Sequence, residues 1–375
     1  MTTENPFHYG SPVEGEQFTG RSEELRALVS RMRNGVNVVL VSPRRYGKTS
    51  LLRAAERRLA GGRPGGATIE VNLLRTTSLA GALTAGAFAV HGAAWHRAKH
   101  ALADFIGRLR VHPVVTFDEA GRPRFEFEPG LDAARTETVL ADVFELLAGE
   151  ARRRPAVLIL DEFQAITRHG VKLPDVLKGL SDEHSKVSLV MAGSKRHLMD
   201  ELVTRAQAPL FGMAEPLAVG PIVEEEMVDY LVHRAKAGGK PMDREVAVQL
   251  LSLAGPVPND IQRLAYEAFD AGTAAVTTSD LEAGMARAVA HAAPLYAEAL
   301  SRLSGGQARV LGELARAPAS EPYAASFARA VGLANASSVH KALAPLLGEE
   351  DVVERGGTLH VADPFLAAWL RGEST

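Results

Sequence analysis

Apolar and amphipathic segments alternate along the first 220 residues of the chain. Four short runs rich in β-branched side chains have the pattern of strands that are buried on both faces. These runs are residues 36–41, 67–72, 156–162 and 187–194. Helical patterns separate them, including the segment that follows Gly47 and residues 136–154. Because strands that alternate with helices usually form parallel sheets, this order predicts an α/β core, a parallel sheet with helices on both faces.

Two further segments lie between the second and third apolar runs. A helical pattern extends from residue 78 to about residue 109. Its most apolar part, residues 79–95, is rich in Ala and Gly and is interrupted by Thr84 and His91, so we expect a buried helix and no membrane span. The sequence VTFDEAGRPRFEFEP alternates on both sides of a glycine-containing turn, which predicts a β-hairpin inserted near residues 114–129.

The pattern changes to helical periodicity after Pro221. Three segments have apolar residues spaced by three and four, and each ends at a glycine, as helices often do. They are residues 223–238, 244–255 and 260–272. We therefore expect a small all-α domain over residues 221–300.

The last segment combines three helical patterns with two short alternating runs around Gly356 and Gly357. The helical patterns cover residues 306–317, 323–331 and 336–347. Three helices followed by a hairpin predict a winged helix-turn-helix domain. The expected organisation is an α/β core over residues 1–220, the helical domain, and the winged helix over residues 301–375.

The composition is that of an ordinary globular protein, with 46% hydrophobic and 23% charged residues. A net charge of −3 gives no overall basic field, so nucleic-acid binding would need a local patch. The absence of cysteine excludes disulfides and a cysteine nucleophile. The first residues, MTTENPFHYGSP, lack the basic and apolar regions of a secretory signal, so we expect a cytoplasmic protein.

The segment SPRRYGKT matches the phosphate-loop pattern G-x-x-x-x-G-K-[ST] at every required position except the first glycine, where Ser42 stands. It lies between an apolar run and a helical pattern, which is the context that this motif requires. Backbone N–H groups and a helix N-terminus favour phosphate there. The expected nucleotide-binding residues are Ser42, Pro43, Arg44, Arg45, Tyr46, Gly47, Lys48, Thr49 and Ser50.

Two residues of this motif and three residues at the ends of later strands have expected roles in binding and hydrolysing ATP with Mg²⁺. Lys48 would neutralise the β- and γ-phosphate oxygens, and the Thr49 hydroxyl would ligate Mg²⁺. Asp161 ends a buried strand, where parallel sheets bind ligands, and would hold Mg²⁺ through water. Glu162 is expected to activate the attacking water as general base. Ser194 ends the next strand and either polarises the water or γ-phosphate or is a plain strand-end serine.

Four motifs carry a resemblance to a known family: FTGRSEEL from Phe18, SPRRYGKTSLL, VLILDEFQ and MAGS. Together they resemble prokaryotic and archaeal AAA+ ATPases of the STAND-related class, which are distantly similar to origin-recognition initiators. The resemblance covers nearly the whole chain. It implies that Phe18 and Arg21 line the adenine pocket, that Ser194 is a sensor, and that residues 221–300 form a lid.

The resemblance also implies a nucleotide-sensing residue in the lid and an arginine finger that acts between subunits. The turn Gly255-Pro256 precedes a helical pattern in which Arg263 occupies the place of the lid sensor, with Gln262 as the alternative. An arginine finger is typical when such ATPases form homo-oligomers, and Arg205 and Arg196 are the candidates. Arg44 and Arg45 remain open between a phosphate, an acidic residue and a neighbouring subunit.

Two functions follow from these patterns. The first is an ATP-hydrolysing, nucleotide-driven switch that cycles between ATP and ADP and contacts a protein partner through the winged helix. The alternative is a DNA-associated ATPase that resembles replication initiators, and a non-hydrolysing ATP-binding module is a third reading. From Ser301 onward seven Lys and Arg residues stand against eight Asp and Glu residues, a net charge of −1. Because duplex binding depends on basic residues, this balance favours the protein partner over DNA.

Overall fold

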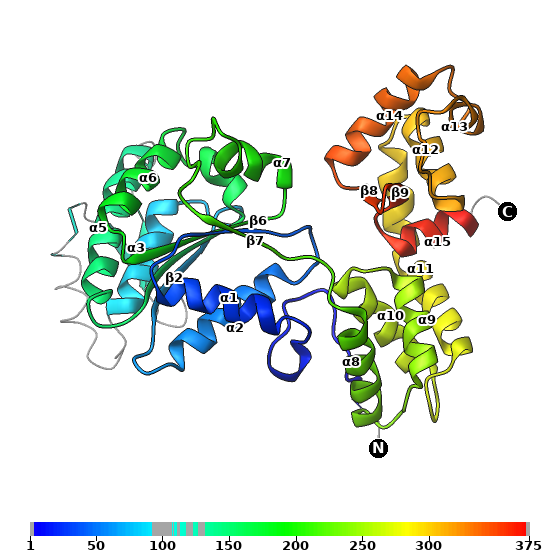
Figure 1. Ribbon diagram of the computed structural model, residues 1–375, viewed down its shortest axis with the longest axis horizontal. Helices are drawn as coiled ribbons and strands as arrows, with labels where there is room; N and C mark the ends of the chain where they lie inside the picture. The colour runs from blue at the N-terminus through cyan, green and yellow to red at the C-terminus, as the bar shows by residue number, and fades with distance from the viewer. Residues whose placement is uncertain are drawn as a thin grey trace. The chain divides into compact units, whose positions relative to one another are not determined.

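The computed structural model describes residues 4–91, 107, 109–110, 113–117, 123–126 and 132–372. The chain divides into two compact units, which Figure 1 shows in ribbon form. Glu14–Gly220 form the first, called here the core unit. Met1–Val13 and Pro221–Thr375 form the second, called here the helical unit. Among the described residues, no helix combines the length and apolar character needed to cross a membrane.

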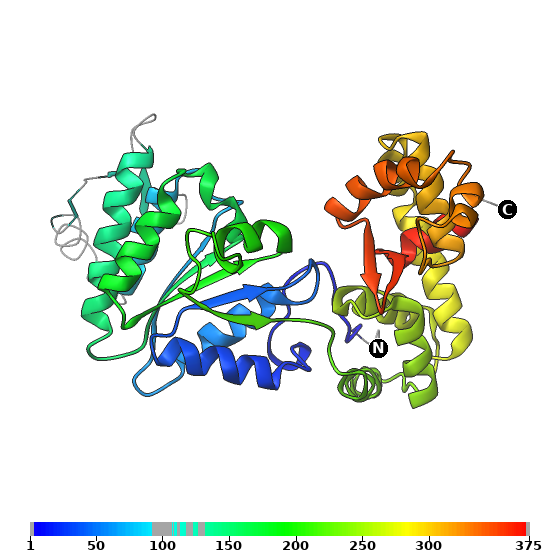
Figure 2. The same cartoon turned by 45° about the horizontal axis from the view of Figure 1, so that its top comes forward.

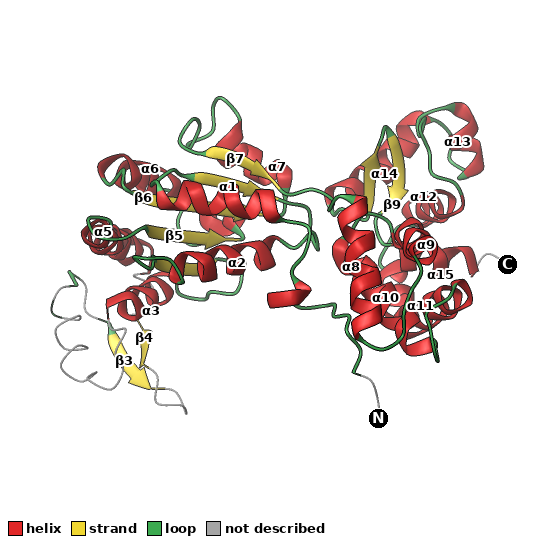
Figure 3. Cartoon of the chain, turned by 60° about the horizontal axis from the view of Figure 1, so that its bottom comes forward, coloured by secondary structure: helices red, strands yellow, loops and turns green. Residues whose placement is uncertain are grey.

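The core unit contains a five-stranded sheet in the order β2-β5-β6-β1-β7, and every pairing is parallel (Figure 3). The strands are β1 (Val38–Val41), β2 (Ala67–Asn72), β5 (Ala156–Asp161), β6 (Val187–Gly193) and β7 (Glu215–Ala218). All residues of β5 and β6 are buried, because both strands have neighbours on each side and helices above and below. The predicted α/β fold is confirmed.

Helices cover both faces of this sheet. In β5, Leu158 and Leu160 belong to a hydrophobic cluster with residues of α3 (Leu79–His91) and α5 (Asp132–Glu150). Val157 and Ile159 point the other way, into a cluster with α1 (Ser22–Arg33) and α2 (Lys48–Ala60). This division follows from the two-residue period of a strand, which sends successive side chains to opposite faces. Helix α6 (Leu173–Glu183) packs beside α5.

Both strands of the hairpin expected near residues 114–129 are present in the structure. β3 (Val114–Phe117) pairs antiparallel with β4 (Pro123–Glu126), with Val115 opposite Phe125. Phe125 is buried, and its ring lies 5.7 Å from that of Phe88 on α3. The turn of the hairpin, and the part of the predicted helix beyond His91 up to residue 106, lie outside the described residues.

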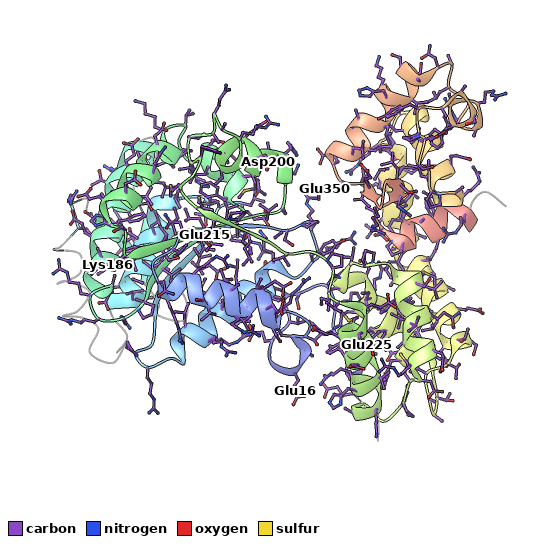
Figure 4. All side chains as sticks on the ribbon, in the orientation of Figure 1. Glu16, Lys186, Asp200, Glu215, Glu225 and Glu350 are labelled. Carbon is purple, nitrogen blue, oxygen red and sulfur yellow. The ribbon has the colours of Figure 1, made fainter. Side chains whose placement is uncertain are left out.

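Short elements connect the larger ones in the core unit. η1 (Gly15–Gln17) precedes α1, and the turn η3 (Phe163–Arg168) follows β5 directly. After β6 come α7 (Arg196–Met199) and the single π-helical turn η4 (Asp200–Thr204). The edge strand β7 was not predicted. Its residues are exposed or half-buried, and Glu215, labelled in Figure 4, accepts a hydrogen bond of 2.7 Å from Arg31 of α1.

The first part of the helical unit contains four helices. They are α8 (Glu224–Ala237), α9 (Arg244–Ala254), α10 (Pro258–Ala271) and α11 (Thr278–Ser301). The amino-terminal segment packs on them: Phe7 is 1% exposed and meets Phe269 edge-on at 5.9 Å. Asn5 donates to the Tyr266 carbonyl at 3.0 Å, and Arg234 donates to the Pro6 carbonyl at 2.9 Å. The segment is therefore part of this hydrophobic core.

The second part of the helical unit has the winged-helix arrangement (Figure 2). Its elements are α12 (Gly305–Arg316), α13 (Ala325–Ala330), α14 (Ala336–Gly348), β8 (Val352–Arg355), β9 (Thr358–Val361) and α15 (Pro364–Gly372). The β8–β9 turn needs positive φ at Gly356 (57°) and Gly357 (78°), which glycine adopts without strain. Asn335 caps α14, accepting from the Ser338 N–H at 2.9 Å.

Candidate functional site

The loop that follows β1 begins with Ser42, whose backbone and side chain both make hydrogen bonds. The Ser42 N–H donates to the Gly193 carbonyl at 3.2 Å, and the buried Ser42 hydroxyl donates to the Pro43 carbonyl at 3.2 Å. Among the described residues of this loop, positive φ occurs at Arg45 (68°) and Gly47 (87°), and Ser42 does not have it. The backbone conformation at the first motif position therefore does not require glycine.

Gly47 turns the chain from this loop into α2. It is the N-cap residue, with left-handed φ 87° and ψ 18°, and its carbonyl accepts the Leu51 N–H at 2.9 Å. No side chain caps the helix. The first-turn N–H groups and the helix dipole therefore give this end of α2 a partial positive charge, which favours an anion.

Lys48, in the first turn of α2, contacts both acids at the end of β5. Its ammonium Nζ donates to Asp161 Oδ1 at 2.5 Å and to Glu162 Oε1 at 3.1 Å. The side chains of Lys48 and Asp161 are 7% and 2% exposed, and that of Glu162 is 20% exposed. Asp161 also accepts from Asn72 Nδ2 at 3.2 Å and from the Glu162 N–H at 2.8 Å. The three charged residues singled out in the sequence are thus brought together.

Two further side chains, those of Gln164 and Ser194, hold the Glu162 carboxylate. Its backbone is left-handed, with φ 55° and ψ 44°. Its Oε2 atom accepts from Gln164 Nε2 at 2.5 Å and from Ser194 Oγ at 3.1 Å. Burial raises the pKa of the Glu162 carboxyl, but the Lys48 charge and three side-chain hydrogen bonds outweigh burial and lower its pKa from 4.5. Glu162 is therefore a carboxylate at neutral pH.

The residues at this end of the sheet fit an anion together with a hard cation. Lys48 and the N-terminus of α2 supply positive charge for phosphate oxygens. The Thr49 hydroxyl and the Asp161 carboxylate are oxygen ligands of the kind that Mg²⁺ prefers. Thr49 follows Lys48 in the first turn of α2, and the neighbouring Ser50 is buried.

The structure gives Arg21 contacts with the backbone of the loop. Arg21 is 3% exposed, and its guanidinium donates to the Tyr46 carbonyl at 3.1 Å and to the Gly220 carbonyl at 2.5 Å. A third contact, of 2.9 Å, joins it to Glu24. Phe18 packs against the cluster formed by α1 and α2. Arg21 thus holds the phosphate loop through the Tyr46 carbonyl. Its predicted contact with adenine stays a prediction.

The two lid-sensor candidates make contacts within the helical unit. Arg263 donates to the Ala288 carbonyl at 2.7 Å, and its guanidinium lies 4.3 Å from the centre of the Phe365 ring. Gln262 is 6% exposed and donates to the Tyr230 hydroxyl at 2.8 Å. These contacts tie α10 to α11, α15 and α8, so both side chains have a packing role whatever they sense.

The finger candidates are in the segment after β6. Arg205 is exposed, and its guanidinium lies 3.7 Å from the Glu201 carboxylate. The side chain of Arg196 lies outside the described part of the chain. In the loop after β1, Arg44 and Arg45 are both exposed.

Sequence reasoning assigned no role to Asn72 and Gln164. Asn72 ends the second apolar run, in register with Asp161 on the adjacent strand. Gln164 stands two residues after Glu162 in the motif VLILDEFQ. The position of Asn72 at a strand end was an available signal, because neighbouring parallel strands present their carboxyl ends together.

Comparison with known proteins supports the fold. A family model described as a probable winged helix domain matches residues 294–372. The structure resembles the Walker-type ATPase PABY2304 of Pyrococcus abyssi, with a TM-score of 0.66, 18% identity, and coverage of 98% of this chain and 99% of that one. A search of curated proteins found no match.

Two further structures are similar at lower scores. The Aeropyrum pernix ORC1 protein, solved in complex with DNA, has a TM-score of 0.49 and 15% identity over 96% of this chain and 94% of that one. The Thermotoga maritima RuvB Holliday junction branch migration motor has a TM-score of 0.45 and 12% identity over 93% and 94%. The likeness to PABY2304 and the winged-helix match confirm the predicted fold, a parallel α/β sheet followed by helices and a carboxy-terminal winged helix, and the STAND-related class is not confirmed.

Proposed function

We propose that this protein is an AAA+ ATPase that binds ATP with Mg²⁺ and hydrolyses it to ADP and phosphate. The observation that carries the proposal is the contact of the phosphate-loop Lys48 with both acids of the Asp161-Glu162 pair. A lysine of this loop binds phosphate oxygens. Of an acidic pair at a strand end, one residue holds the metal and the other activates the water. A bound nucleoside triphosphate with Mg²⁺ would use all three groups in these complementary roles.

In the proposed reaction Glu162 is the general base. It accepts a proton from a water molecule whose oxygen forms a bond to the γ-phosphorus, while the bond from that phosphorus to the β–γ bridging oxygen breaks. The bond's electron pair leaves with ADP. Lys48 and the N-terminus of α2 balance the charge of the phosphate oxygens. The Thr49 hydroxyl would ligate Mg²⁺, and Asp161 would hold it through water. Mg²⁺ supplies further positive charge at those oxygens when it is bound.

We further propose that nucleotide turnover drives a conformational switch, in which the winged helix contacts a protein partner. Within the winged helix, six of the seven basic residues donate to acceptors of the same chain. They are Arg302, Arg309, Arg316, Arg329, Arg355 and Arg371. Together with the net charge of −1 from Ser301 onward, which gives this segment no basic excess for duplex phosphates, these contacts favour a protein partner.

The alternative is a DNA-associated ATPase that resembles replication initiators. In such a protein α14 would be the recognition helix, and with its N-cap it offers polar and basic side chains for phosphate contacts, namely Asn335, Ser337, Ser338, His340 and Lys341. Basic residues in the core unit, Arg152-Arg153-Arg154 and Arg57-Arg58, would allow the full-length protein to bind DNA even if the isolated winged helix does not.

The deciding experiment measures ATP turnover with and without duplex DNA, together with the mass of the protein in a non-hydrolysable ATP analogue. Turnover that depends on Mg²⁺ and ignores DNA supports the switch. Turnover stimulated several-fold by duplex supports the alternative. Absence of turnover despite analogue binding would leave an ATP-binding module. A mass above one chain in the analogue would support a homo-oligomer.

A further inference from the structure

The two oxygens of the Glu162 carboxylate have different surroundings. Oε2 accepts two hydrogen bonds, from Gln164 Nε2 and from Ser194 Oγ. Oε1 accepts from Lys48 alone among the described residues. Because a carboxylate oxygen accepts about two hydrogen bonds, Oε2 is saturated and Oε1 retains one position.

Gln164 is placed rigidly for this contact. It lies in η3, between Phe163 and Ala165, which are 0% and 2% exposed. Its carboxamide lies against the end of β6, where a Cβ added at Gly193 would come within 2.8 Å of Gln164 Oε1 and 2.3 Å of Met199 Sδ. The glycine of the MAGS motif thus leaves the space that the carboxamide occupies.

The orientation of the carboxamide follows from its neighbour. Gln164 Oε1 is buried and has no hydrogen-bond partner among the described residues. Turning the amide over would place Oε1 against Glu162 Oε2, bringing two acceptors together. The carboxylate therefore holds the amide with Nε2 toward it, although the amide oxygen gains no donor.

We infer that Gln164 is a positioning residue that, with Ser194, holds Glu162 Oε2 and leaves Oε1 as the oxygen that takes the proton from water. This rests on the proposed ATPase function. Lys48 is the residue expected to bind phosphate oxygens. When nucleotide is bound, Lys48 therefore no longer donates to Oε1, whereas Gln164 and Ser194 continue to donate to Oε2. A carboxylate with one saturated oxygen presents the other in a single direction, and orientation of this kind acts on turnover and not on ground-state binding.

The test compares Gln164→Met, which keeps the length of the side chain and removes the donor, with the exposed control Gln207→Met. We expect Gln164→Met to lower kcat for ATP by about 10- to 100-fold, the range of a misplaced general base. Its affinity for ADP and a non-hydrolysable analogue should stay within about threefold of wild type. Gln207→Met should match wild type in both measurements.

A second readout uses the ligand-free protein. In a ¹⁵N–¹H spectrum of side-chain amides, the Gln164 resonance is identified by its loss in Gln164→Met. We expect its proton at low field and expect it to move in Glu162→Gln, which replaces the charged acceptor. A Gln164 resonance whose proton chemical shift is the same in wild type and in Glu162→Gln would overturn the inference.

The kinetic outcomes separate the two claims. If wild-type protein turns over ATP and Gln164→Met matches it while remaining folded by its thermal unfolding midpoint, the inference is wrong and the ATPase function stands. If wild-type protein has no turnover, the proposed function fails, and the amide spectrum alone still tests the contact. A parallel loss of nucleotide affinity and kcat would also overturn the positioning role, because it would indicate a disturbed site.

Discussion

Replacing Lys48 by Met tests whether the buried ion pair is as close as the structure shows. The change removes an ammonium that is 7% exposed and leaves the Asp161 carboxylate, 2% exposed, without its cation. Removing one partner of a buried pair typically costs about 3–5 kcal/mol. Asp161 keeps the Asn72 and Glu162 N–H donors, so we expect a loss near the lower end, about 3 kcal/mol in the free energy of unfolding.

A double variant isolates the charge effect. Asp161→Asn removes the uncompensated charge, so Lys48→Met with Asp161→Asn should be less destabilised than the sum of the two single variants, by about 2 kcal/mol. Urea unfolding of the nucleotide-free protein at neutral pH gives all four free energies.

The contact of Lys48 with Glu162 also predicts a pH dependence. Since the pKa of Glu162 is below 4.5, its favourable contacts are present above the unfolded-state pKa and are lost as the pH falls through the folded-state pKa. The difference between wild type and Lys48→Met should therefore shrink in acid. A Lys48→Met variant within about 0.5 kcal/mol of wild type at pH 7, with additive double-variant energies, would refute a close buried pair.

Four other predictions follow. Lys48→Ala should abolish nucleotide affinity, whereas Glu162→Gln should bind ATP and lose turnover; native-rate hydrolysis by Glu162→Gln would exclude it as the base. Arg263→Ala should lower the affinity ratio of ATP analogue to ADP if Arg263 senses the γ-phosphate; an unchanged ratio, with a lower melting temperature from the lost Phe365 contact, would leave it only the packing role. The isolated winged helix should bind a labelled duplex weakly or not at all, and sub-micromolar, salt-sensitive binding would contradict this. Burial, followed by a neighbouring carboxylate, raises the pKa of Glu56 to about 7, so stability should fall as the pH rises from 4.5 to 7. Glu56→Gln should reduce that fall in thermal unfolding scans, because the pKa of the neighbouring Glu70 is also raised, and an unchanged pH profile would contradict the shift in Glu56.

The local patterns of the sequence determined the core elements and the phosphate loop. Buried strands carry their own signal, because β5 and β6 are covered on both faces and need apolar side chains at every position. The edge strand β7 has exposed positions and no such signal, and it was missed. α11 and α15 were also not predicted, although both are helices in the structure.

Only the tertiary structure decided which groups meet at the site. Lys48 and Glu162 are 114 residues apart, and their contact depends on the strand order that places β1 and β5 on either side of β6. The hydrogen bond from Gln164 needs the short helix η3 after β5 and a glycine on β6 that leaves room for the amide. The packing of Arg263 on Phe365 joins residues of α10 and α15. The spacing of residues along the chain determines periodicity and motif chemistry, whereas contacts between distant segments are set by how the sheet and helices pack.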